Sequence, residues 1–153
     1  MRLAMTIRLM IPAVLLAACV IVHALVMTFM LRQLSRSVRP KTFHFCRSMW
    51  ILIRTALYLI SAHLAEIAIW ASFLTSQHVF PDFRTSFYFS AVTYTTVGYG
   101  DLVLPDQWRM LAAAEALTGI LMCGWSTGVF FAVVSRMYFA QSPETKGIEG
   151  IGR

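Results

Sequence analysis

The sequence predicts an all-α membrane protein in which three helices cross the bilayer and a shorter segment enters it and returns. Of the 153 residues, 58% are hydrophobic and only 13% are charged, whereas soluble globular chains are about 45–50% apolar and about 25% charged. The mean hydropathy is +0.68. Three apolar stretches are long enough to span a bilayer, which takes about 20 residues, and a fourth is too short.

The first span is expected from about Leu9 to Leu31. Arg2 and Arg8 precede it, and this arrangement also resembles a secretory signal. A signal core would stop earlier, but here the apolar run continues to Leu31. We therefore expect an uncleaved transmembrane helix.

A short basic segment follows the first span. It accounts for much of the formal net charge of +6, and basic residues next to spans mark the cytoplasmic side of a membrane. This placement excludes a soluble nucleic-acid binder. The spacing faintly resembles a voltage sensor, but sensor arginines lie inside a span. We interpret these residues as a topology anchor and as contacts for anionic lipid: they are Arg32, Arg36, Arg39, Lys41 and Arg47.

The second span is expected from about Met49 to Leu74 and contains His63 and Glu66. These two side chains lie one helical turn apart and can pair. A pH-sensing role for the pair is an alternative, because histidine titrates near neutral pH. Haem ligation by His63 together with His23 is disfavoured, since the two residues are expected at different depths in the membrane.

Between the second span and the third, which runs from about Trp108 to Ala140, lies the segment Thr75–Gln107. Pro81 and Asp82 suit a helix start, and two glycines end the apolar tract from Ser86 to Val97. Irregular backbone at membrane depth persists only where protein buries it or where it lines a wet cavity. The segment therefore predicts a re-entrant helix and loop beside a pore.

The tract Thr96–Asp101 has residue types suited to binding a dehydrated cation. Such an ion needs oxygens in place of its water shell, and backbone carbonyls supply them if consecutive peptides point one way. Gly98 and Gly100 permit this backbone, because glycine adopts positive φ without steric cost. The hydroxyl of Thr96 adds a further oxygen, and the Asp101 carboxylate attracts cations to the mouth. Val97 and Tyr99 are expected to point away and to wedge the strand against the short helix.

The letters Thr-Val-Gly-Tyr-Gly-Asp resemble the signature of the potassium channel pore family, and Thr93–Thr96 resembles the end of its pore helix. The resemblance covers Met49–Ala140, as outer helix, pore helix, selectivity-filter loop and inner helix. It implies that K⁺ binds at Thr96, Val97, Gly98 and Tyr99, and that Gly100 and Asp101 close the outer end.

One strand presents oxygens on one side only, so several strands must surround the ion. Because the family arranges four, the resemblance implies a homotetramer. The family's filter faces outside, which implies a multi-pass protein of the cell (inner) membrane with its N-terminus outside and its C-terminus in the cytoplasm. The charge bias of the basic segment independently favours the same orientation.

Further residues are candidates for gating and for support of the filter. By the same resemblance, Gly119 is interpreted as a hinge of the inner helix. Gly124 and Gly128 have the G-x-x-x-G spacing that lets helices approach closely. Glu115 is expected to make a structural hydrogen bond behind the filter, because a carboxylate is costly in hydrocarbon. Tyr88 and Thr95 complete the candidates for filter support.

The chain thus divides into a first helix with its basic loop (1–47), a pore domain (48–140) and a short disordered tail (141–153). Cys19, Cys46 and Cys123 lie outside the predicted outer loop, so no disulfide framework is implied. We expect a potassium-selective channel subunit, not an enzyme, with no cofactor other than the permeant ion and no cluster of metal ligands. The alternatives are a weakly selective cation channel and a non-conducting regulatory subunit.

Overall fold

The computed structural model describes residues 2–37 and 45–139. In this part of the chain the only regular structure is helical, as predicted. The elements are α1 (Arg2–Ser37), α2 (Phe45–Ser76), α3 (Phe83–Tyr94), the 3₁₀ turn η1 (Asp106–Trp108) and α4 (Arg109–Phe139). The predicted tail, together with Arg39 and Lys41, lies outside the described residues.

Three helices are long and apolar enough to cross a membrane, which confirms the three predicted spans. The candidate spans are Met10–Leu34, Cys46–Ser76 and Asp106–Met137. Their lengths of 25, 31 and 32 residues exceed the minimum of about 20. Each candidate span overlaps the predicted stretch and differs from it by a few residues at the ends.

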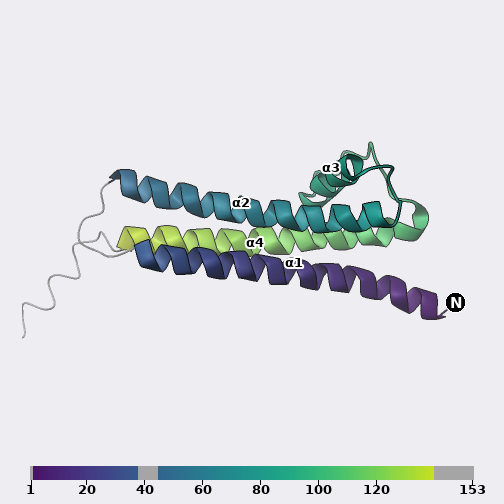
Figure 1. Ribbon diagram of the computed structural model, residues 1–153, viewed down its shortest axis with the longest axis horizontal. Helices are drawn as coiled ribbons and strands as arrows, with labels where there is room; N and C mark the ends of the chain where they lie inside the picture. Colours follow the sequence, from purple (N-terminus) through teal and green to yellow (C-terminus); the bar gives the residue numbers. More distant parts are fainter. Residues whose placement is uncertain (1, 38–44, 140–153) are drawn as a thin grey trace, which may run out of the picture.

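The three long helices lie side by side, and α3 sits at one end of this bundle (Figure 1). The amino end of α1 lies at the end that carries α3, whereas α2 begins at the opposite end. α3 packs against α2 and α4, and α1 packs against α2 and α4 of its own chain. The sequence did not indicate where the first helix would pack.

The start of α3 follows from a local signal that the sequence contains. Asp82 is the N-cap, with an extended backbone at φ −149° and ψ 166°. Its Oδ1 accepts a hydrogen bond from the Thr85 backbone N–H at 2.7 Å, which satisfies a donor that the helix itself leaves unpaired. The same hydrogen bond lowers the pKa of Asp82. The predicted helix start is confirmed.

The interior joins side chains from all four helices. Cys19, Trp70, Tyr94 and Met122 are each at most 4% exposed and belong to one core cluster. Because lipid is as apolar as leucine, close packing and interhelical hydrogen bonds hold such a bundle together. Many other large apolar side chains are exposed on the single chain, among them Leu57 and Phe131 at 57% and 70%.

Candidate ion-binding filter

The filter loop is tied to the last turn of α3 by its own backbone. Thr96 donates its N–H to Thr93 O at 2.9 Å, and Val97 donates to Val92 O at 3.0 Å. The Gly98 N–H also reaches Val92 O, at 3.3 Å. These bonds fix the direction in which the loop leaves the helix, so α3 positions the first residues of the signature.

Every second residue of the loop from Thr96 to Gly100 has a positive φ. The φ angle is +61° at Thr96, +58° at Gly98 and +77° at Gly100. An ordinary strand points successive carbonyls to opposite sides, and a left-handed residue at every second position counters this alternation. The left-handed backbone expected at the two glycines is present. Thr96 was not expected to adopt it, because a β-branched residue there is a genuine outlier.

The filter residues are exposed in the single chain. All positions from Thr95 to Asp101 fall in the exposed class, with Val97 at 52% and Tyr99 at 71%. Within one chain neither side chain is buried against the pore helix, so the expected wedge stays a prediction for the assembled protein. The filter loop of a single chain has no neighbouring copy to cover it.

The outer mouth is braced by a hydrogen bond between α3 and the end of the signature. Tyr88 Oη donates to Asp101 Oδ2 at 2.7 Å, and this bond raises the pKa of Tyr88. The phenol therefore keeps its proton and its donor role at neutral pH. Thr95, the other hydroxyl considered for this support, instead bonds Ala91 O of its own helix at 2.6 Å.

Gly119 allows α4 to approach the end of the pore helix closely. A Cβ at this position would lie 1.9 Å from the backbone oxygen of Tyr94, so no larger residue fits without a shift. Cβ atoms at Gly124 and Gly128 would meet nothing within 4 Å. Within one chain, close packing therefore belongs to Gly119 rather than to the G-x-x-x-G pair.

Glu115 is buried behind the filter, with an exposed fraction of 1%. It faces Ser90 of α3, which is also fully buried. The Oε1 of Glu115 and the hydroxyl of Ser90 both lack a hydrogen-bond partner within the described ranges. The expected burial is present, whereas a hydrogen bond to a Thr or Tyr hydroxyl is not.

A polar cluster that the sequence did not predict lies in the middle of the bundle. His63 Nδ1 is 3.5 Å from Glu66 Oε2, which is the expected pair. His23 joins them, with its Nδ1 at 2.7 Å from Glu66 Oε1, and the two imidazole centroids are 5.4 Å apart. The expectation that the histidines lie at different depths is wrong, because the axial register of α1 cannot be read from its sequence. Both Nε2 atoms face Ser126, an arrangement that does not fit axial ligands on opposite sides of a haem.

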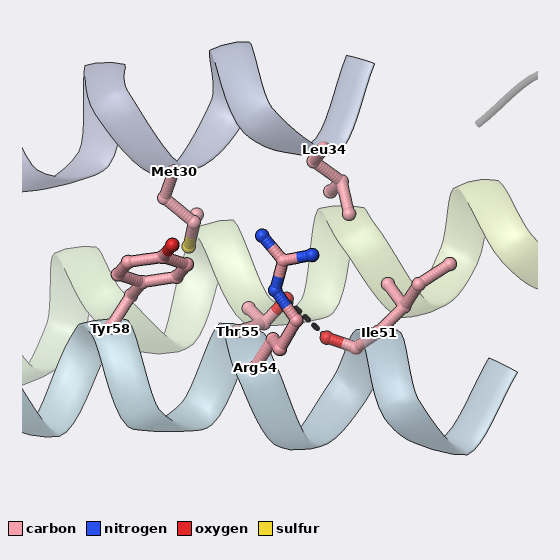
Figure 2. Close-up of a pocket in the computed structure, with 6 residues that line it drawn as sticks. All are labelled: Met30, Leu34, Ile51, Arg54, Thr55 and Tyr58. Atoms are coloured by element: carbon pink, nitrogen blue, oxygen red, sulfur yellow. Dashed lines mark hydrogen bonds between the residues drawn. The ribbon is translucent and has the colours of Figure 1, made fainter. Parts of the chain in front are cut away.

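The opposite end of the bundle has a small hollow between α1 and α2 (Figure 2). It has room for about one water molecule, at about 10 Å³. The Arg54 guanidinium points from α2 toward α1 and lies 6.0 Å from the centre of the Tyr58 ring. Among the residues predicted to contact lipid, Arg32 and Arg47 are exposed.

These features define a class of protein: a multi-pass membrane protein with a pore loop between two of its spans. The ion channel family matches residues 45–136, and the chain belongs to this family. Within it, the sequence is similar to potassium channel subunits, so the chain is a member of the potassium channel pore family and not an enzyme.

The similar proteins include the "Voltage-gated potassium channel regulatory subunit KCNG2" of Gallus gallus and of Rattus norvegicus. Each is 31% identical over 112 residues, which are 71% of this chain. The human protein of the same name is 31% identical over 93 residues, or 59% of this chain. The matched part is 18–22% of these relatives, so the chain spans about a fifth of their length. No solved structure matches the chain.

Proposed function

We propose that this chain is the subunit of a potassium-selective channel that conducts K⁺ passively. The observation that carries the proposal is the alternating positive φ at Thr96, Gly98 and Gly100 in a loop between two spans. This backbone favours a column of carbonyl oxygens, which can replace the hydration shell of K⁺. In this proposal K⁺ binds at Thr96, Val97, Gly98 and Tyr99, residues 48–140 form the pore domain, and no other cofactor is needed.

The proposed assembly is a homotetramer. Potassium channel family members generally assemble as tetramers in membranes, and one strand cannot surround an ion. The exposure of Val97 and Tyr99 in the single chain supports this, since neighbouring copies can cover both side chains. The open surroundings of Gly124 and Gly128 are compatible with a contact between inner helices of two copies.

The proposed orientation places the filter and the N-terminus outside and the C-terminus in the cytoplasm of the cell (inner) membrane. The amino end of α1 lies at the filter end of the bundle (Figure 1), as this orientation requires. The basic segment then meets the cytoplasmic leaflet, where Arg32 and Arg47 can contact anionic lipid. Gating is assigned to α4 around Gly119 or to the filter itself.

A second candidate function is that of a non-conducting regulatory subunit. The similar proteins are named as regulatory subunits, and this favours the alternative. A subunit of that kind would keep the pore fold and conduct only in a heteromer with other subunits.

Ion flux from liposomes that contain only the purified protein tests the proposal and separates the alternatives. We expect K⁺ efflux and a reversal potential in mixed Na⁺ and K⁺ that follows the K⁺ gradient. Efflux without discrimination indicates the weakly selective channel. Absence of flux from protein that is a tetramer by native mass spectrometry overturns the conducting function and favours the regulatory one.

A further inference from the structure

Five polar side chains form a closed ring of contacts in the middle of the bundle. The ring members come from all four helices: His23 (α1), His63 and Glu66 (α2), Tyr94 (α3) and Ser126 (α4). Four of the five are at most 6% exposed, and the His63 side chain is 20% exposed. Polar groups in a membrane are costly, so a cluster of this size points to a function.

Possible metal-ligand atoms of four residues converge on one side of the ring. His23 Nδ1 lies 2.7 Å from Glu66 Oε1, and His63 Nδ1 lies 3.5 Å from Glu66 Oε2. The Tyr94 hydroxyl is 2.9 Å from His63 Nδ1 and also donates to Glu66 Oε2. Ligands around a tetrahedral ion at about 2.0–2.1 Å are separated by about 3.3 Å. The ligand atoms of His23, His63 and Glu66 all lie within 4.8 Å of one another, so shifts on the order of 1 Å bring them to the spacing of such an ion.

The other side of the ring supplies a hydrogen-bond acceptor for the second ring nitrogen of each histidine. Metal-bound imidazoles usually donate their second ring N–H to an acceptor, which fixes the tautomer. Here both Nε2 atoms reach one oxygen, Ser126 Oγ, at 3.2 Å from His23 and 3.0 Å from His63. A hydroxyl oxygen has two lone pairs, so it can accept from both imidazoles when both Nδ1 atoms are ligands. Without an ion, Ser126 must donate to one imidazole and accept from the other.

We propose that His23, His63 and Glu66, with Tyr94 as fourth ligand, form a binding site for a divalent transition-metal ion of the zinc class. Two imidazoles and a carboxylate are a donor set that such ions take. The ion enters from the side of His63, whose side chain is partly exposed. The bound ion links α1 and α2 to Tyr94, which lies two positions before Thr96.

The protons balance as follows. The neutral, ion-free ring has five protons. Tyr94, Ser126 and the two histidines hold one each, and the fifth lies between Glu66 and His23 in their 2.7 Å contact. Binding releases this fifth proton and the Tyr94 proton to solvent and leaves three, on the two Nε2 atoms and on Ser126. The charges of the ion, the carboxylate and the phenolate then sum to zero, which the low-dielectric interior favours.

The first test uses the full-length protein in nanodiscs, freed of any affinity tag and treated with a chelator. It is titrated with Zn²⁺ by calorimetry and with Co²⁺ by absorption spectroscopy. We expect one ion per chain and the intense visible bands of four-coordinate Co²⁺. His23→Gln, His63→Gln and Glu66→Gln should each weaken Zn²⁺ binding by at least about tenfold, and Ser126→Ala by about tenfold or more. The matched control is His78→Gln, because His78 is an exposed histidine of the α2–α3 loop.

X-ray absorption of the Zn²⁺-loaded wild-type protein keeps the proposal testable if the variants do not assemble. We expect two imidazole ligands at about 2.0–2.1 Å. An absence of Zn²⁺ binding, a shell of oxygen ligands alone, or equal affinity in the three ligand variants and in the wild type would each overturn the site. None of these results depends on whether the protein conducts K⁺.

Discussion

Gly119 determines how closely the inner helix approaches the end of the pore helix. The resemblance to the potassium channel pore family predicts a hinge at this position, because that family bends its inner helix at a glycine below the filter. In the structure α4 runs without interruption from Arg109 to Phe139, and a Cβ at Gly119 would overlap the Tyr94 carbonyl oxygen. The glycine in the sequence thus suggested a position where a side chain is not tolerated. It did not show whether the reason is a bend in the helix or the close approach of a neighbouring backbone.

We expect Gly119→Ala to destabilise the assembly by about 1–3 kcal/mol or more, the range of overpacking changes, because backbone atoms cannot move aside easily. Thermal unfolding in detergent and K⁺ flux measure the effect. Gly124→Ala in the same helix is the comparison, because a Cβ there meets nothing within 4 Å in its own chain, so a loss of stability in that variant reports a contact between copies instead. Wild-type stability and flux in Gly119→Ala would contradict the close approach.

Gly100→Ala should abolish or scramble K⁺/Na⁺ discrimination. The φ of +77° at Gly100 costs about 1–2 kcal/mol per residue for any side chain. An added Cβ meets nothing within 4 Å, so the backbone and not a clash drives the change. Reversal potentials in mixed Na⁺ and K⁺ measure it, and unaltered discrimination would exclude the proposed filter geometry.

At the scale of the elements, α3 shows what a sequence can predict. Its start depends on neighbouring residues, because Pro81, Asp82 and Thr85 build the cap within one turn, and the prediction was right. The polar ring depends instead on the rotation and axial register of four helices. Residues such as His23 and Ser126 are 103 positions apart, and no local pattern brings them together. The same reasoning explains why the place of α1 was not predictable.

The cap of α3 should make the stability of the pore loop depend on pH. The folded pKa of Asp82 is lowered by the Thr85 N–H, so the cap stabilises the fold above the unfolded pKa of about 3.9. This contribution is lost as pH falls through the folded pKa. Thermal unfolding between pH 7 and pH 3 should show it.

Asp82→Asn is the matched variant for this test, because asparagine also caps helices but does not titrate. We expect the wild type to lose stability relative to Asp82→Asn below about pH 4, and Asp82→Ala to be less stable than both at pH 7. Parallel pH profiles for the wild type and Asp82→Asn would show that the cap carboxylate does not contribute.

At the scale of the whole molecule, composition and hydropathy predicted the three spans, whereas the exposure of the filter was not foreseen. Local signals in a sequence describe each segment by itself, but the burial of Val97 and Tyr99 needs neighbours that one chain does not contain. The expected wedge against the pore helix therefore stays a prediction for the assembled protein.

Chemical labelling tests the orientation of the bundle. Cys46 is exposed at the start of α2, at the end of the bundle remote from the filter (Figure 1). In a Cys123→Ser background, a membrane-impermeant maleimide should label Cys46 in inverted vesicles and not in intact cells. A cysteine placed at Gln77, in a chain with Cys46→Ser, should show the reverse. Labelling of Cys46 from outside would invert the proposed topology.

The open surface of the filter in one chain also has a genetic consequence. If four copies must complete the ion pathway, a single faulty copy damages the whole assembly that it joins. A cell that makes intact and faulty chains in equal amounts would then retain only roughly one sixteenth of its assemblies fully intact, by random mixing of four places. Mutations in the signature are therefore expected to be dominant, and more harmful than the loss of half of the intact chains.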